Sequence, residues 1–240
     1  MSSVDILTFA SSAVILGLAY VIVCTVNGYL QTWFIDKLGD PTAKELGYLA
    51  LSPERHIDLV GFIACVLLGI GWHMPVPINA QRIQGYLRLP RVLLAYLTST
   101  LCALILAMGT LVVSLAVFGE NPTYRFLSIV FHSQEKLDFG RILSIFEGYS
   151  SSVILIGLLI AASIVLNLYI AVLNFIYNMI RLFLFIGVEK SYTYANHSEN
   201  ILTFGTLLGF FLFKPFVSNI FFSLIIRAAH YITYFLGILS

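Results

Sequence analysis

The residues best able to do chemistry in this chain are five histidines and three cysteines. Two histidines at i and i+4 on a helix, with a glutamate beside the first, bind zinc and supply a general base. The five histidines, His56, His73, His132, His197 and His230, do not have this spacing. We expect His56 and His73 to form hydrogen bonds that stabilise loops; a new metal site is the alternative. The cysteines, Cys24, Cys65 and Cys102, lie far apart in apolar segments, which predicts buried small side chains.

Five amide side chains occur within or at the border of long apolar stretches; they are Asn27, Gln31, Asn167, Asn174 and Asn178. Lipid offers no hydrogen-bond partner, so a polar group at membrane depth must find one in protein. We expect these amides to bond between helices and lock a helix bundle. Alternatively, they line a groove that grips the transmembrane segment of another protein.

Two arginines also border apolar sequence. Arg181 follows a long charge-free run, and a charge at membrane depth is costly and often functional. It either reaches the membrane surface or fills a pocket beside Asn27 and Gln31. Arg227 and His230 are three residues apart and share a helix face. This spacing predicts an interfacial helix with a polar edge, or a polar contact to a partner subunit.

The composition predicts an all-α polytopic membrane protein. The chain has 240 residues, of which 59% are hydrophobic and 10% are charged, whereas soluble domains have about 25% charged residues. Charge-free runs at 6–35, 59–81, 92–119 and 149–180 are each long enough to cross a bilayer. With the less regular C-terminal portion, in which Pro215 ends or kinks a helix, they predict five or six transmembrane or interfacial helices. We expect residues 1–240 to form a single transmembrane domain.

The polar connections between these runs do not orient the protein. If each run crosses the membrane, Lys and Arg number six on one side and four or five on the other, a difference too small for the positive-inside rule. The net charge of +1 gives no basic field for nucleic acid, so we expect no nucleic-acid partner.

Three motifs occur in order in the first third of the chain. They are LGDPTAK at 38–44, HIDLVG at 56–61 and GWHMPVPIN at 71–79. Together they resemble the site-2 protease family of intramembrane zinc metalloproteases, and the spacing of Asn167 and Asn174 extends the resemblance weakly to about residue 213. The residues shared with the family frame are Gly39, Asp40, Pro41, His56, Asp58, Pro75, Pro77, Asn79 and Asn174.

The resemblance implies a site-2-protease-like core, a scaffold that receives a transmembrane helix laterally, and a zinc site. In the family, HExxH ends shortly before the Gly-Asp-Pro run, and a later aspartate is the third ligand. The matching positions here are Asn27, Gly28 and Gln31, with Leu182 in place of the aspartate. Amides are poor zinc ligands, so we predict a degenerate member without metal or other cofactor, which is not an enzyme.

Three functions follow from these observations. The first is a structural, helix-packing subunit of a hetero-oligomeric membrane complex, whose partners are the lipid bilayer and other transmembrane proteins. The second is a free-standing regulator that binds transmembrane segments without cleaving them, and the third is a membrane protease with a rebuilt metal site. We expect the chain in a bacterial cytoplasmic membrane; an organelle inner membrane is the alternative.

Overall fold

The regular elements of the described part of the chain are helices, and Ile57 and His73 form one isolated β-bridge between loops. The computed structural model describes residues 3–132, 144–145, 148–187 and 223–234. Its elements are α1 (Ser3–Leu38), α2 (Thr42–Glu45), the 3-10 turn η1 (Pro53–Arg55), α3 (Leu59–Leu68), α4 (Arg88–Phe118), α5 (Glu120–His132) and α7 (Ser151–Gly187), followed by a helix at 223–234. The expected all-α membrane class is confirmed. The expected segment at 201–213 lies outside the described residues.

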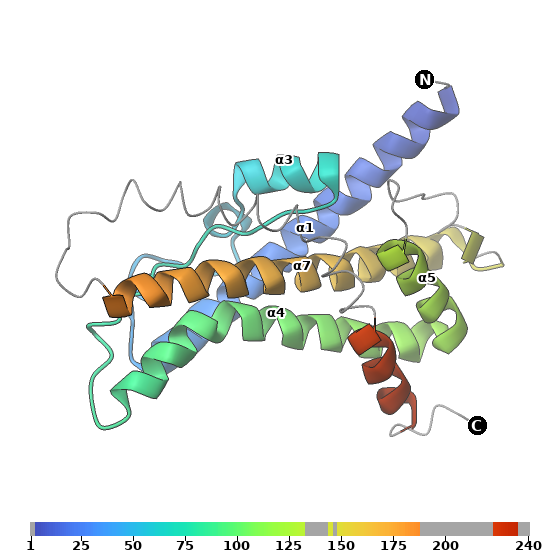
Figure 1. Cartoon of the computed structure of the whole chain (residues 1–240). Coiled ribbons are helices and arrows are strands. Elements are labelled where there is room, and N and C mark those ends of the chain that lie inside the picture. Colours follow the sequence, from blue (N-terminus) through green and yellow to red (C-terminus); the bar gives the residue numbers. More distant parts are fainter. Residues whose placement is uncertain (1–2, 133–143, 146–147, 188–222, 235–240) are drawn as a thin grey trace.

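Three helices, α1, α4 and α7, are long and apolar enough to cross a membrane. At about 1.5 Å per residue, the 31 residues of α4 extend well beyond the roughly 30 Å of a hydrocarbon core. The helices pack into one bundle in which α4 and α7 run antiparallel and α1 crosses both (Figure 1). Arg181 near the end of α7 therefore lies beside Tyr96 near the start of α4.

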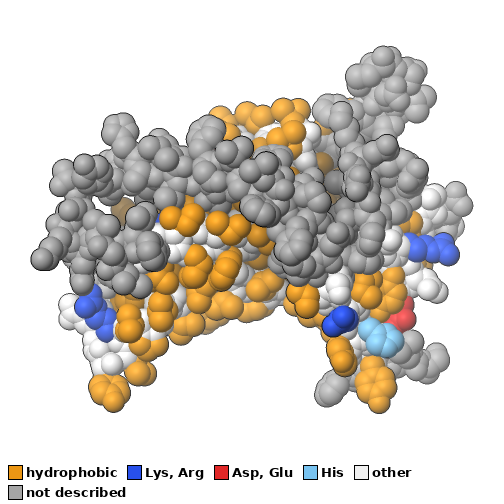
Figure 2. Space-filling model, viewed as in Figure 1, with side chains coloured by type: hydrophobic (Ala, Val, Ile, Leu, Met, Phe, Trp, Pro, Cys, Tyr) orange, Lys and Arg blue, Asp and Glu red, His pale blue; other side chains and the backbone are white. Residues whose placement is uncertain are grey.

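Large apolar side chains remain exposed along the outer side of this bundle. On α4 they include Leu94, Leu101 and Ile105, whose spacing places them on one helix face. Figure 2 shows hydrophobic side chains over much of the described surface, while Lys and Arg lie towards the ends of the molecule. We expect such a hydrophobic surface to face the acyl chains of membrane lipids.

The run at 59–81, expected to cross the membrane, forms only a short helix. α3 has 10 residues, about 15 Å, which is half of a hydrocarbon core. The Asp58 side chain caps its first turn by accepting from Gly61 N at 2.7 Å, and Gly69 ends it with φ of +71°. The rest of the run contains no helix because Pro75 and Pro77 lack a backbone donor. This expectation was therefore wrong for the second run.

α3 enters and returns on the same end of the bundle. Asn79 after α3 bonds to Asp40 before it, and Arg82 pairs with Glu45 at 2.6 Å. Tyr20 of α1 holds both loops at depth, since its hydroxyl lies 2.9 Å from the Asp58 carbonyl oxygen and 2.6 Å from that of Trp72. The loops before and after α3 therefore lie on the same side of the bundle. A membrane-crossing segment between them had predicted that they lie on opposite sides.

Candidate functional site

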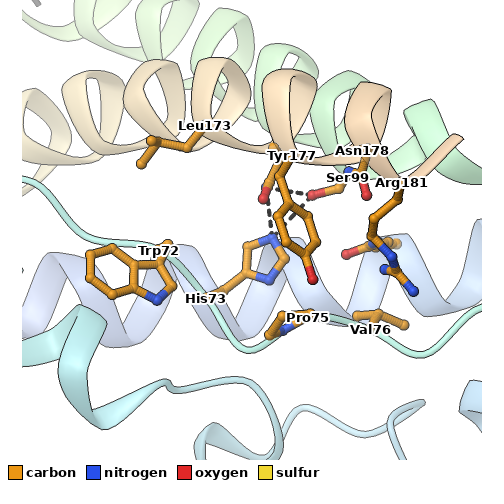
Figure 3. A pocket seen from close by; sticks show the side chains of 11 residues that line it. Trp72, His73, Pro75, Val76, Ser99, Leu173, Tyr177, Asn178 and Arg181 are labelled. Carbon is orange, nitrogen blue, oxygen red and sulfur yellow. Dashed lines mark hydrogen bonds between the residues drawn. The ribbon is translucent and has the colours of Figure 1, made fainter. Parts of the chain in front are cut away.

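A pocket that is partly open to the outside lies between α1, the extended segment after α3, α4 and α7, with a volume of about 50 Å³ (Figure 3). At about 10–15 Å³ per water centre, this volume holds a few water-sized groups. Its apolar walls are Trp72, Pro75, Val76, Leu173 and Tyr177, and its polar walls are Gln31, His73, Ser99, Asn174, Asn178 and Arg181. The pocket therefore combines apolar surface with neutral and cationic polar groups.

His73 joins the extended segment to the helices. Its Nδ1 lies 2.8 Å from the Met74 carbonyl oxygen, which only accepts, so Nδ1 carries the hydrogen and Nε2 is the acceptor. Nε2 lies 3.1 Å from Ser99 Oγ on α4 and 2.9 Å from Asn174 Nδ2 on α7. Asn174 Nδ2 also donates to Ser99 Oγ. Burial lowers the pKa of His73, and the neutral ring acts as a hydrogen-bonded junction of three segments.

Two other amides of the pocket are buried. The residues Gln31 and Asn178 are only 3% and 4% exposed, and the Gln31 Oε1 atom has no hydrogen-bond partner within the described part of the chain. The Gln31 Oε1 atom is fully buried. The side-chain atoms Oδ1 and Nδ2 of Asn27, another buried amide of α1, also have no hydrogen-bond partner among the described residues. Because a buried amide without a partner costs about 1–3 kcal/mol, the pocket presents unmet hydrogen-bonding capacity.

Arg181 brings a positive charge to this wall. Its guanidinium lies over the rings of Tyr96 (5.8 Å) and Tyr177 (5.6 Å), at distances typical of cation–π contacts. One of the two alternatives for Arg181 was that it fills a pocket and donates to Asn27 or Gln31, but the side-chain oxygens of both amides have no hydrogen-bond partner among the described residues. Asn174, Asn178 and Arg181 follow one another at i, i+4 and i+7, so one face of α7 supplies the polar wall.

His56 lies against Gly28 of α1. Its Nε2 donates to the Ala50 carbonyl oxygen at 3.0 Å, which leaves Nδ1 as an acceptor without a described partner. A Cβ at position 28 would lie 2.1 Å from that Nδ1. Burial lowers the pKa of His56. The imidazole thus occupies the space into which any side chain at position 28 would extend.

The remaining motif residues hold the loops in place. The buried Asp40 carboxylate accepts from Thr42 N at 3.1 Å and from Asn79 N, which joins the first motif to the third. Pro41 is the residue before α2, and Gly39 has φ of +104°, which glycine adopts without strain. The motif residues therefore build the rim of the bundle on one side of α1.

Other predicted site residues lie away from the pocket. Leu182 is 8% exposed and packs with Val92 and Tyr96 in an apolar cluster. Asn167 donates to the Ser163 carbonyl oxygen of its own helix at 2.9 Å. Arg227 is exposed on the helix at 223–234. The roles predicted for these residues stay predictions.

The described residues do not fit a zinc ion. They contain no group of three or more His, Cys, Asp and Glu side chains that could hold a metal, whereas a zinc site needs three or four such ligands. The His73 Nε2 is occupied by Ser99 and Asn174, and the His56 Nδ1 faces the backbone of Gly28. We derive no catalytic step through a metal here.

The comparisons with known proteins give one partial relative. Over 57 residues the chain is 37% identical to "Putative zinc metalloprotease YwhC" of Bacillus subtilis (strain 168), and the match covers 24% of this chain and 26% of that protein. No protein-family profile matches the chain, and no solved structure matches it. The chain thus has a limited similarity to a protein that is named as a metalloprotease.

This similarity corrects one prediction. The prediction that the chain is not an enzyme is contradicted, because the matched relative is named as a protease. The site-2-protease-like relationship is supported in part by the same match. The predicted loss of the zinc ligands has not been tested.

Sequence reasoning did not single out Trp72, Ser99 and Tyr177 as site residues, although all three line the pocket. Trp72 lies in the third motif, so its position near the site could have been predicted from the sequence. Ser99 and Tyr177 stand where the resemblance places further family motifs whose own residues are absent here, and the tertiary packing brings these two to one cavity.

Proposed function

We propose that this chain is a site-2-protease-like membrane protein that binds a membrane-embedded segment of another protein in the pocket between α1, α4 and α7. The observation that carries the proposal is the buried amide oxygen of Gln31, which has no hydrogen-bond partner among the described residues and lies in the pocket wall together with Asn178. In a membrane such groups need a partner, and lipid chains supply none. A polypeptide backbone supplies both donors and acceptors.

The surroundings of the amides suit a polypeptide as well. Trp72, Leu173 and Tyr177 form apolar and aromatic walls against which side chains of a membrane segment can pack. The partial similarity to a protein named as a metalloprotease supports the same reading, since a protease must bind polypeptide.

We propose that the bound segment belongs to a stable partner, so that the chain is a subunit of a hetero-oligomeric complex in a bacterial cytoplasmic membrane. A free-standing regulator that binds and releases such segments is the alternative. Gentle solubilisation followed by sizing separates the two: a stoichiometric co-purifying membrane protein supports the subunit, and a lone chain supports the regulator.

Site-specific photo-crosslinking tests the binding itself. Trp72→p-benzoylphenylalanine replaces one large aromatic side chain of the pocket wall by a photoreactive one. The matched control places the same group at Ile105, which is 59% exposed on α4 and outside the pocket. We expect the pocket probe, irradiated in native membranes, to form a discrete polypeptide adduct that the control does not form. Lipid adducts alone from both probes would overturn the proposal.

A further inference from the structure

We propose that the pocket selects a helical membrane segment that carries an asparagine or glutamine side chain at the depth of Gln31. This inference rests on the proposed function, because it names the feature of the bound segment that the pocket recognises. Three features support it: the burial of Gln31, the hydrogen bonding of a transmembrane helix, and the size of the pocket.

The first support is the position of Gln31. Its side chain lines the pocket from α1 and is only 3% exposed, and its Oε1 atom is buried without a hydrogen-bond partner among the described residues. The pocket is partly open, so a group of another molecule can enter beside this carboxamide. A hydrogen bond from that group to Gln31 would therefore stabilise the occupied pocket.

The second support is that the middle of a helix has no backbone group to spare. Each backbone N–H of an α-helix bonds to the carbonyl four residues before it, so the side chains of a helical segment must supply the partner of Gln31. Among neutral side chains, asparagine and glutamine carry a donor and an acceptor on one planar group. Two carboxamides therefore pair whichever way each is turned, and no charge has to enter the membrane.

The third support is the size of the pocket, which separates a side chain from an unwound backbone. Its volume of about 50 Å³ holds a few water-sized groups. A carboxamide group is of this size, whereas an unwound turn of backbone with its side chains is several times larger. The volume therefore favours one polar side chain inserted from a regular helix.

Defined peptides test the inference. The probes are biotin-labelled Leu/Ala peptides of about 20 residues, the length of one membrane crossing, with both termini blocked as amides. One has a central Asn, a second a central Gln and a third a central Leu. A fourth has a central Gly-Pro pair, which frees backbone groups without adding a polar side chain. Each is titrated in detergent micelles against the chain with the Trp72 photoprobe, and the concentration for half-maximal adduct formation is measured.

We expect the Asn or the Gln peptide to reach half-maximal adduct formation at a concentration about threefold to tenfold lower than the Leu peptide. This is the range that one hydrogen bond between helices gives in a membrane. The comparison of the peptides needs no further substitution in the pocket.

Two variants of the photoprobe chain show whether Gln31 is the group that recognises the amide. Gln31→Met keeps an unbranched side chain without a polar amide, so it should remove the preference. Asn27→Leu is the matched control, because Asn27 is also a buried amide of α1 without a partner among the described residues but is not one of the residues that line the pocket. It should keep the preference, and melting temperatures identify a misfolded variant.

Three results overturn the inference while leaving the proposed function intact. Equal affinities of the Asn, Gln and Leu peptides would show that the pocket binds polypeptide while water satisfies Gln31. A preference that survives in Gln31→Met would place the recognition at another group. Tighter binding of the Gly-Pro peptide than of both amide peptides would assign an unwound backbone to the pocket. Adduct formation by none of the four peptides would contradict the proposed function itself, and the inference with it.

Discussion

At the scale of single residues, the contact between Gly28 and His56 decides what position 28 can hold. The imidazole Nδ1 lies 2.1 Å from the place of a Cβ at this glycine, closer than any real contact between such atoms. Gly28 is therefore required by packing in this structure, whatever its ancestry. The sequence showed that the position lacks a glutamate, but it did not show that a histidine from a distant loop fills the space.

Gly28→Ala should destabilise the protein by roughly 1–3 kcal/mol, the usual cost of an overpacked core. Gly109→Ala is the matched control, because Gly109 is also in a long helix and has nothing within 4 Å of its Cβ position. Unfolding in detergent measures both variants. Equal stability of the two variants would show that His56 moves aside without cost.

The two buried histidines predict a pH dependence of stability. Burial lowers the pKa of His56 and His73, so the folded state binds fewer protons than the unfolded state. Stability should be full above the unfolded value of about 6.5 and should fall as the pH drops below it. His56→Gln keeps an N–H donor for Ala50 and does not titrate. It should reduce the loss of melting temperature between about pH 7.5 and 5; an unchanged loss would exclude His56 as a source.

At the scale of elements, one carboxylate connects the loop before α3 to the loop after it. Asp40 is fully buried and accepts from the backbone of Thr42 and Asn79. The sequence could show that these motifs occur together, but not why. The physical reason is that the two oxygens of the Asp40 side chain accept from two backbone N–H groups, one of which is 39 residues away along the chain.

Asp40→Ala should therefore cost roughly 2 kcal/mol or more, because two N–H groups lose their acceptor. Glu45→Gln is the comparison, since its pair with Arg82 is also between these loops but is exposed to solvent. We expect little change for Glu45→Gln in the same unfolding measurement. If Asp40→Ala behaved like Glu45→Gln, the link through Asp40 would contribute nothing.

Hydropathy predicted α1, α4 and α7 well, because a charge-free run of sufficient length is a direct consequence of the bilayer. It failed at 59–81, where the run is long enough but a left-handed glycine and two prolines divide it. Length alone does not show where a helix ends. The cap at Asp58 and the turn at Gly69 were visible in the sequence and are the signals that should have had more weight.

At the scale of the whole molecule, the return of α3 changes the distribution of charge. The end where α1 finishes and α4 begins has seven of the described Lys and Arg residues: Lys37, Lys44, Arg55, Arg82, Arg88, Arg91 and Arg181. The opposite end, with α5 and the helix at 223–234, has Arg125 and Arg227 (Figure 1). If the chain lies in a bacterial cytoplasmic membrane, as we propose, the positive-inside rule predicts that the first end faces the cytoplasm.

Cysteine labelling tests this topology. The native cysteines are buried, so single cysteines introduced at the exposed positions Glu54, Gln81 and Asn121 can be labelled selectively. With a membrane-impermeant maleimide on sealed vesicles, Glu54→Cys and Gln81→Cys should react from the same side and Asn121→Cys from the other. Labelling of the first two from opposite sides would mean that α3 crosses the membrane.

The candidate site was predicted in part. Gln31, Asn174, Asn178 and Arg181 were named from the sequence, because polar groups at membrane depth are rare and need partners. The sequence did not predict which of these side chains would find hydrogen-bond partners. Asn174 bonds to His73 and Ser99, whereas the Gln31 Oε1 atom is buried without a partner among the described residues. The relative placement of three helices and a loop decides this.

The most direct test of the account is the stability of the purified protein after two buried amides of its pocket are made apolar. Gln31→Met with Asn178→Leu keeps the shapes of both side chains, and Asn174→Leu is the matched control in the same pocket. If the amides await a partner, the double variant should melt at a higher temperature than the native chain, because a buried unpaired group is removed. Adduct formation at the Trp72 photoprobe should fall at the same time. Asn174→Leu should melt lower, since it breaks bonds to His73 and Ser99. A double variant that melts lower than the native chain and keeps its adduct would contradict the account.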